Sequence, residues 1–299
     1  MREHLIESNG IELRVLEEGE GPAIVLCHGF PELAYSWRHQ IPVLAQAGYR
    51  VLAPDMRGYG GSTVPPNVED YDVLTVGRDV IGLLDRFGED EAILIGHDWG
   101  ATVCWTLALT HPERVRAVAG LSVPFAMRPP VPPMQIFNRR LGEDWYQNWF
   151  QQVGPADEAM ARQVARTVCA TEDWTEEWAN RPDPDPHPRA SWLTEEELAV
   201  FVEALSRTGF SGGLNYYRNI DRNWELTPHL DGKRIEQPAL FVTGGDDIVR
   251  RFMPARGLER AFADLRGFVV LDGAGHWIQQ ERAAEVNAEL LGFLASLGA

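Results

Sequence analysis

The clearest candidate for chemistry in this 299-residue chain is Asp98, the middle residue of Gly-His-Asp-Trp-Gly at 96–100. An apolar run at 92–95 precedes this turn, and a helical pattern at 99–110 follows it. Small residues at both ends of the turn let a strand and a helix come close, which predicts a sharp elbow that exposes the Asp98 side chain. Aspartate is ordinarily ionised at pH 7, so it can attack carbon directly and would leave an ester on the enzyme.

Taken alone, this pattern is also compatible with an ordinary turn, so the rest of the chain has to supply the context. Asp246 and Asp247 follow the apolar run 239–243, and His276 follows the run 267–271. Nucleophile, acid and base therefore occur in the order expected for an α/β-hydrolase, each just after a predicted strand. The carboxyl ends of parallel strands share one edge of a sheet, so a single site can hold all three. Composition does not decide which of the two adjacent aspartates is the acid.

The elements that must position these residues suggest an α/β-hydrolase fold. Strand and helix patterns alternate over residues 1–126 and again over 231–299, which predicts a mostly parallel sheet flanked by helices. Residues 127–230 open with a proline-rich connector and carry aromatic-rich helical patterns without a strand pattern. They predict an inserted helical cap at the carboxyl edge of the strands.

The individual elements follow from hydrophobic periodicity and from turn residues. Strands are expected within 4–18 as a hairpin, and at 23–27, 49–53, 92–95, 115–123, 239–243 and 267–271. Helices are expected at 36–47, 75–87, 99–110, 254–263 and 279–297, and a loop is expected at 181–188.

Composition excludes several classes of partner. The net charge is −17, which argues against nucleic acid or an anionic membrane surface as a partner and is typical of a soluble protein. The three cysteines, Cys27, Cys104 and Cys169, lack the spacing of a metal site or a disulfide pair, which predicts reduced thiols in a cytoplasmic protein. We expect no signal peptide, no membrane-spanning segment, no metal and no cofactor.

Together these motifs resemble the soluble-type epoxide hydrolases of the α/β-hydrolase fold family. The resemblance is carried by His-Gly-Phe-Pro at 28–31, Gly-His-Asp-Trp-Gly at 96–100 and Gly-His-Trp at 275–277, and it covers nearly the whole chain. It implies that the protein converts a small-molecule epoxide and water to a vicinal diol, with an ester on Asp98 as the intermediate. It also implies two cap tyrosines that bind and protonate the epoxide oxygen, and the matching positions are Tyr146 and Tyr217.

The same resemblance assigns the remaining roles. His276 would activate the hydrolytic water, and the family's spacing from the strand end makes Asp247 the acid that orients it. Backbone N–H groups of Phe30 and Trp99 would bind the oxyanion, with a cis peptide between Phe30 and Pro31. Substrate contacts are expected from Phe30, Pro31, Trp99 and Trp277. His28 is assigned to the structure of its loop, and Glu32 is placed just behind the site, although an exposed position remains open.

Two alternatives stay open at this point. A haloalkane dehalogenase shares the Asp–His–acid chemistry, but Phe30 stands where the usual halide-binding partner of Trp99 would be. A non-catalytic ligand-binding relative would typically lack a member of the triad. Tyr146 lies among aromatic residues that could simply form the cap core. Six cap tryptophans suggest an apolar aromatic pocket: Trp145, Trp149, Trp174, Trp178, Trp192 and Trp224. The sequence is also compatible with a homo-oligomer.

Overall fold

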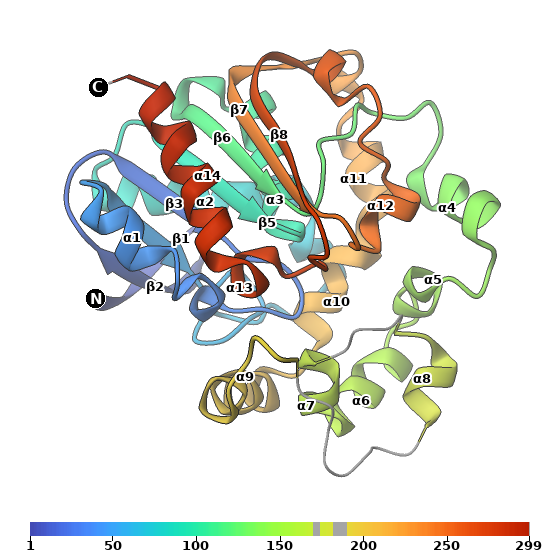
Figure 1. Ribbon diagram of the computed structural model, residues 1–299. Helices are drawn as coiled ribbons and strands as arrows, with labels where there is room; N and C mark the ends of the chain where they lie inside the picture. Colours follow the sequence, from blue (N-terminus) through green and yellow to red (C-terminus); the bar gives the residue numbers. More distant parts are fainter. Residues whose placement is uncertain (170–173, 182–189, 299) are drawn as a thin grey trace.

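An eight-stranded sheet forms the centre of the computed structural model, which describes residues 1–169, 174–181 and 190–298 (Figure 1). The strand order is β1-β2-β4-β3-β5-β6-β7-β8. The first pairings, β1 with β2 and β2 with β4, are antiparallel, and all the others are parallel. The strands are β1 Arg2–Ser8, β2 Ile11–Glu18, β3 Ala23–Cys27, β4 Arg50–Pro54, β5 Ala92–His97, β6 Val115–Leu121, β7 Ile235–Gly244 and β8 Phe262–Leu271.

Helices cover both faces of the sheet. In the order of the chain they are η1 Ala34–Trp37, α1 Ile41–Gln46, η2 Val68–Tyr71, α2 Val73–Phe87, α3 Trp99–Thr110, η3 Pro112–Arg114, α4 Pro133–Leu141, α5 Tyr146–Phe150, α6 Pro155–Arg162, α7 Val164–Val168, α8 Glu176–Asn180, α9 Glu195–Thr208, α10 Ser211–Arg218, α11 Ile220–Leu226, η4 Pro228–Leu230, α12 Val249–Phe252, η5 Leu258–Ala261, α13 Ile278–Glu281 and α14 Ala283–Ser296.

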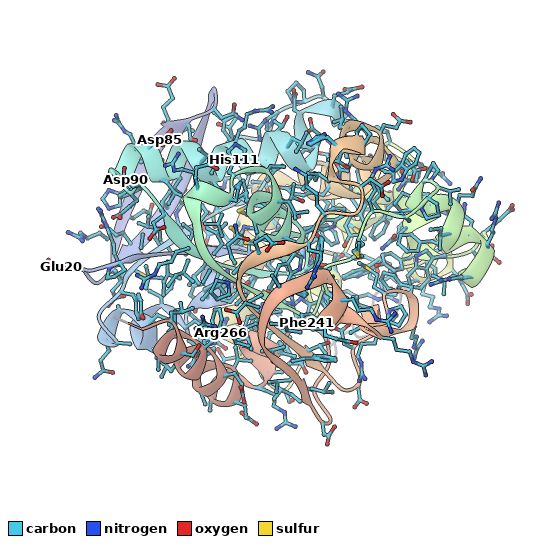
Figure 2. All side chains as sticks on the ribbon, turned by 90° about the horizontal axis from the view of Figure 1, so that it is seen from above. Glu20, Asp85, Asp90, His111, Phe241 and Arg266 are labelled. Carbon is cyan, nitrogen blue, oxygen red and sulfur yellow. The ribbon has the colours of Figure 1, made fainter. Side chains whose placement is uncertain are left out.

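The core has two layers because successive strand residues face opposite sides of the sheet. In β5, Ile93 and Ile95 pack with α1 and α14, whereas Ala92 and Leu94 pack with α2 and α3. Figure 1 shows α1 and α14 on one face of the sheet and α2 and α3 on the other. This is the sandwich that an α/β-hydrolase fold requires, as expected from the alternating pattern. Outside it, acidic residues such as Glu20, Asp85 and Asp90 are exposed at the periphery (Figure 2).

The described residues between β6 and β7 form helices and loops but no strand, from α4 to η4. Figure 1 shows α5 to α9 gathered beside one edge of the sheet. An ion pair of 2.7 Å between Arg38, just after η1, and Glu197 of α9 joins the two parts. On this basis we propose the division of the chain into a core, 1–126 and 231–299, and a cap, 127–230.

Several expected elements differ in the structure. The helix expected at 254–263 is wrong: α12 ends at Phe252, and β8 already begins at Phe262. Gly257 lies between them with a φ of 74°, a left-handed conformation that interrupts a helix. The helix expected at 36–47 is divided into η1 and α1.

The carboxyl-terminal helix is also divided. The helix expected at 279–297 is split into α13 and α14 at Arg282, whose φ of −131° is not helical. Residues 182–188 of the expected loop lie outside the described residues. Within the described part of the chain, no helix combines the length and the apolar character needed to cross a membrane.

Candidate active site

Asp98 lies at a tight elbow between β5 and α3. Its φ of 52° and ψ of −120° are unusual for a residue with a side chain, and such a conformation costs about 1–3 kcal/mol. The elbow needs glycine on both sides, because a Cβ on Gly96 would overlap the carbonyl of Gly100, and one on Gly100 would overlap the carbonyl of Cys27. The helix, the strand and the neighbouring strand β3 are therefore in backbone contact, and this contact holds Asp98 above the sheet.

One oxygen of Asp98 is bound by the loop that follows β3. The backbone N–H of Phe30 donates to Oδ1 of Asp98 at 2.8 Å. The peptide bond between Phe30 and Pro31 is cis, as expected. Gly29 lies so close that a Cβ there would overlap the Asp98 side chain. Trp99 is the first residue of α3, so its N–H belongs to a helix N-terminus, where backbone donors lack a partner within the helix.

The other oxygen of Asp98 faces His276. Nε2 of His276 lies 3.6 Å from Oδ2 of Asp98, and Nδ1 lies 3.0 Å from both carboxylate oxygens of Asp247. Asp247 is buried, and its Oδ1 also accepts the N–H of Val249 at 2.8 Å. Asp246 is exposed, and its N–H donates to the carbonyl of Ala274. Of the two adjacent aspartates, the structure therefore brings Asp247 to His276.

The charges around His276 change the pKa of its imidazole. Burial alone lowers the pKa of this imidazole, but the carboxylates of Asp247 and Asp98 outweigh burial and raise the pKa well above its usual value. The proton on His276 is therefore stabilised as long as both carboxylates are charged.

A second histidine supports the first from behind. Nδ1 of His97 lies 2.6 Å from the carboxylate of Glu32, and Nε2 lies 2.9 Å from the backbone oxygen of His276. The ring of His97 thus links the Glu32 carboxylate to the backbone of His276. The hydroxyl of Ser122 donates to the same His276 oxygen at 2.6 Å. The sequence offered no signal for this contact beyond the place of His97 next to Asp98.

Glu32 is fully buried at the centre of this support. Its carboxylate accepts from the side chains of Gln279 at 2.7 Å and Gln280 at 3.2 Å, and from the N–H of Gly29 at 3.2 Å. Burial raises the pKa of Glu32, but the charge and hydrogen bond of His97 outweigh it and lower the pKa to about 2. Glu32 thus lies behind the site rather than in solvent, and its pairing with His97 compensates for the cost of burying the Glu32 charge.

Two cap tyrosines face Asp98 from the other side. Tyr146 belongs to α5 and Tyr217 to α10, and their ring centroids are 6.3 Å apart. The Tyr217 ring packs edge-on against Trp99 with a centroid distance of 5.1 Å. Burial and then the charge of Asp98 raise the pKa of Tyr217 well above its usual value, so the hydroxyl keeps its proton. The neighbouring Tyr216 points elsewhere, because its hydroxyl donates to the backbone oxygen of Arg57 at 3.0 Å.

A cavity of about 640 Å³ opens onto Asp98, Trp99, Tyr146 and Tyr217. This volume suits a small organic ligand. Phe30, Pro31 and Trp277, predicted as substrate contacts, are not among the lining residues, whereas Trp99 is. Phe30 is almost fully buried in an aromatic cluster with Trp174, and Trp277 packs on Trp174 and Trp192. Their contact with substrate therefore stays a prediction.

Most of the cap tryptophans pack against other side chains and do not line the cavity. Trp224 lines the cavity. Trp178 is buried beneath the guanidinium of Arg166, which lies 4.6 Å from its ring centroid. Within the described part of the chain, no three His, Cys, Asp or Glu side chains form a group that could hold a metal ion.

Comparison with known proteins agrees with this geometry. Residues 22–283 match the family model of the alpha/beta hydrolase fold. The chain is 47% identical over 314 residues to Epoxide hydrolase A of Mycobacterium tuberculosis, covering 99% of this chain and 98% of the relative. It is 39% identical over 309 residues to Epoxide hydrolase 3 of Siraitia grosvenorii, covering 98% of each. The crystal structure of Epoxide Hydrolase A from Mycobacterium thermoresistibile superposes with a TM-score of 0.91 at 48% identity, covering 98% of each chain. The chain therefore belongs to the soluble-type epoxide hydrolases of the α/β-hydrolase fold family.

Proposed function

We propose that this enzyme hydrolyses an epoxide to a vicinal diol through a covalent ester on Asp98. The observation that supports this most is the placement of the Asp98 carboxylate, which has the His276–Asp247 pair on one side and two tyrosines on the other. A nucleophile flanked by a base and by acids has what both halves of the reaction need.

In the first half of the reaction, an oxygen of Asp98 attacks one carbon of the epoxide ring. The bond from that carbon to the ring oxygen breaks, and its electron pair goes to the oxygen. Tyr146 and Tyr217 hydrogen-bond to this oxygen, and one of them transfers its proton to it. General acid assistance of this kind is worth roughly 10²–10⁴-fold in rate. Because the pKa of Tyr217 is raised, its hydroxyl is protonated before the reaction. For the same reason, a tyrosinate at this position readily takes up a proton afterwards.

In the second half, His276 removes a proton from water, and the oxygen of that water attacks the ester carbonyl. The oxyanion is bound by the N–H of Phe30, which already touches Asp98, and by the N–H of Trp99. Removing a donor of this type costs about 10²–10³-fold in analogous sites. The bond between the acyl carbon and the diol oxygen then breaks, and the leaving diol takes the proton from His276. The regenerated Asp98 carboxyl loses its proton to the tyrosinate, which restores the enzyme. Asp247 stabilises the imidazolium that forms meanwhile.

The two halves are coupled through charge. Once Asp98 is an ester, it no longer carries the negative charge that helps to raise the pKa of His276. The pKa of this imidazole then falls, and the neutral form needed to activate water becomes accessible when the ester is present.

The alternative functions have less support. A dehalogenase would have to stabilise a halide, but Phe30 is packed among aromatic rings, and two tyrosines line the cavity with Asp98 instead. A ligand-binding relative would not need the complete set of Asp98, Asp247 and His276. We also propose a small-molecule substrate and a cytoplasmic location, since the three cysteines are free and buried.

The first prediction separates the two halves of the reaction. In His276→Gln, Asp98 can still be alkylated, but the ester should be hydrolysed at least about 10²-fold more slowly because the base is lost. Intact-protein mass spectrometry after mixing with an epoxide should therefore find an adduct, and peptide mapping should locate it on Asp98. Asp98→Ala is the control that should form no adduct. Normal turnover by His276→Gln would remove this residue from the mechanism.

The second prediction uses the adjacent aspartates as a matched pair. Asp247→Asn should slow ester hydrolysis by about 10²–10⁴-fold, because a neutral amide supports imidazolium poorly and favours the wrong tautomer. Asp246→Asn should remain within about twofold of the wild type, since an exposed substitution away from the site has little effect. Rapid-quench measurement of ester breakdown gives both rates. Equal losses in the two variants would contradict the assignment.

The third prediction concerns the tyrosines. Tyr146→Phe and Tyr217→Phe should each slow alkylation by roughly tenfold or more, and the double variant by at least about 10³-fold, since one donor partly replaces the other. Tyr49→Phe is the control, because Tyr49 directly precedes β4 and does not line the cavity. Ester formation in single-turnover mixing gives the rates. A double variant that alkylates at the wild-type rate would assign both rings to cap packing alone.

A further inference from the structure

The carboxyl end of β6 has an unusual backbone conformation. Ser122, the residue that follows this strand, has a φ of 66°, and the N–H of Val123 donates to the carbonyl of Leu121 at 2.8 Å. The chain therefore forms a classic γ-turn here, which is rare and strained. Among the described residues, the only others with a side chain and a positive φ are Asn9 and Asp98. Strained residues persist only where their surroundings hold them, and they cluster at functional sites, which points to a function of this turn.

Three hydrogen bonds connect the turn to the three segments that carry the proposed triad. The carbonyl of Leu121 also accepts the N–H of Asp98 at 3.3 Å. The N–H of Ser122 donates at 2.8 Å to the carbonyl of Val242, two residues before β7 ends. The hydroxyl of Ser122 donates to the carbonyl of His276 at 2.6 Å. Because β6 lies between β5 and β7 (Figure 1), this one turn contacts the elbow, the strand that leads to the acid, and the loop of the base.

The strained conformation directs the hydroxyl of Ser122 to the base. Because the N–H of Ser122 is bonded to β7, the value of φ decides in which direction its Cβ and its hydroxyl lie. With a φ of 66°, the fully buried hydroxyl reaches the carbonyl of His276. Serine is not among the residue types that are enriched at positive φ, whereas asparagine and aspartate are. The bond to His276 therefore depends on a conformation that serine does not readily adopt.

This bond holds the base through its backbone. The carbonyl of His276 accepts the hydroxyl of Ser122 and lies 2.9 Å from Nε2 of His97, so it is held from two sides. A carbonyl is part of a planar peptide unit, so holding it fixes the backbone from which the imidazole extends. The imidazole lies 3.0 Å from Asp247 and 3.6 Å from Asp98. Catalytic groups have to be held within about 0.5 Å of the productive geometry, so a small shift of this backbone would misplace the base.

We propose that Ser122 is a positioning residue for ester hydrolysis, and that its strained turn and buried hydroxyl hold the backbone of His276 at the correct distance from Asp98. Ser122 does not line the active-site cavity, so it acts through the base rather than on the substrate. The inference rests on the proposed function, since His276 has to activate water only if an ester forms on Asp98. Alkylation of Asp98 does not need this base, so loss of the hydroxyl should slow ester hydrolysis much more than alkylation.

The test removes the hydroxyl and measures the two steps separately. In Ser122→Ala, rapid-quench mixing with styrene oxide should show ester hydrolysis slowed about tenfold, a loss that one hydrogen bond can account for. Alkylation should stay within about twofold of the wild type, because it does not use the base. Ser122→Gly also lacks the hydroxyl, but glycine takes a positive φ without strain. It should slow ester hydrolysis to a similar extent, and it keeps the test decisive if Ser122→Ala does not fold.

Ser8 provides a matched control. Its buried hydroxyl donates to the carbonyl of Asp79 at 2.8 Å, and neither residue lines the cavity. Ser8→Ala should lower the midpoint of thermal unfolding, but both reaction steps should stay within about twofold of the wild type. Ester hydrolysis at the wild-type rate in both Ser122 variants, or equal slowing of the two steps, would overturn the inference and leave the proposed function intact. The absence of an ester on Asp98 in the wild type would instead overturn that function.

Discussion

The imidazole of His276, held between two carboxylates, is the interaction on which the rest of this structure depends. Asp247 bonds one ring nitrogen at 3.0 Å, and Asp98 lies 3.6 Å from the other. Buried charges are costly unless they are paired, so each charged group here needs a partner of opposite sign. Glu32 and His97 form the second buried pair, directly behind the first. Because these charges lie so close together, the loss of one charge changes the pKa of the neighbouring groups.

The core and the cap are connected through these charges. Arg38 contacts Glu197 of the cap at 2.7 Å and Gln280 of the core at 2.6 Å. Gln280 in turn bonds Glu32, whose partner His97 bonds the backbone of His276. A continuous set of contacts therefore runs from helix α9 to the proposed base. The position of the cap and the position of the imidazole are fixed by the same set of hydrogen bonds.

The proposed acids are positioned by backbone contact. Helix α10 lies against the loop after β4 so closely that a Cβ on Gly212 would meet the backbone of Gly58. The hydroxyl of Tyr216 bonds the same loop, which turns the next residue, Tyr217, toward Asp98. Adjacent helical residues point about 100° apart, so fixing one of them orients the other.

Local patterns allowed most of the fold to be predicted from the sequence. The helix after the elbow was expected at 99–110, and α3 has these bounds, because a glycine-flanked turn and a continuous apolar run leave little choice. The prediction of a helix at 254–263 was wrong because Gly257 takes a left-handed conformation in a segment whose sequence otherwise resembles a helix. Contacts between distant segments were harder to predict. His97 and Glu32 are 65 residues apart, and nothing in either local pattern reports their contact.

The choice between Asp246 and Asp247 also shows what local sequence patterns do not predict. Residue types alone do not separate two adjacent aspartates, and only the family resemblance favoured Asp247. In the structure they lie in a turn in which the N–H of Asp247 donates to the backbone oxygen of Gly244. This turn buries the Asp247 side chain and leaves the Asp246 side chain exposed. The family resemblance likewise predicted substrate contacts from Phe30, Pro31 and Trp277. Packing places Phe30 in an aromatic cluster, and the contacts of these residues with substrate stay a prediction.

The central claim is that an enzyme oxygen, not a water oxygen, first attacks the epoxide. It is tested most directly by one turnover in ¹⁸O-labelled water with enzyme in excess over epoxide. The account predicts that the diol from this turnover contains no label, because its new oxygen comes from Asp98, and that mass spectrometry finds the label in the Asp98 carboxylate. Label in the first-turnover diol, with an unlabelled Asp98, would contradict the covalent ester and would mean that water attacks the epoxide directly.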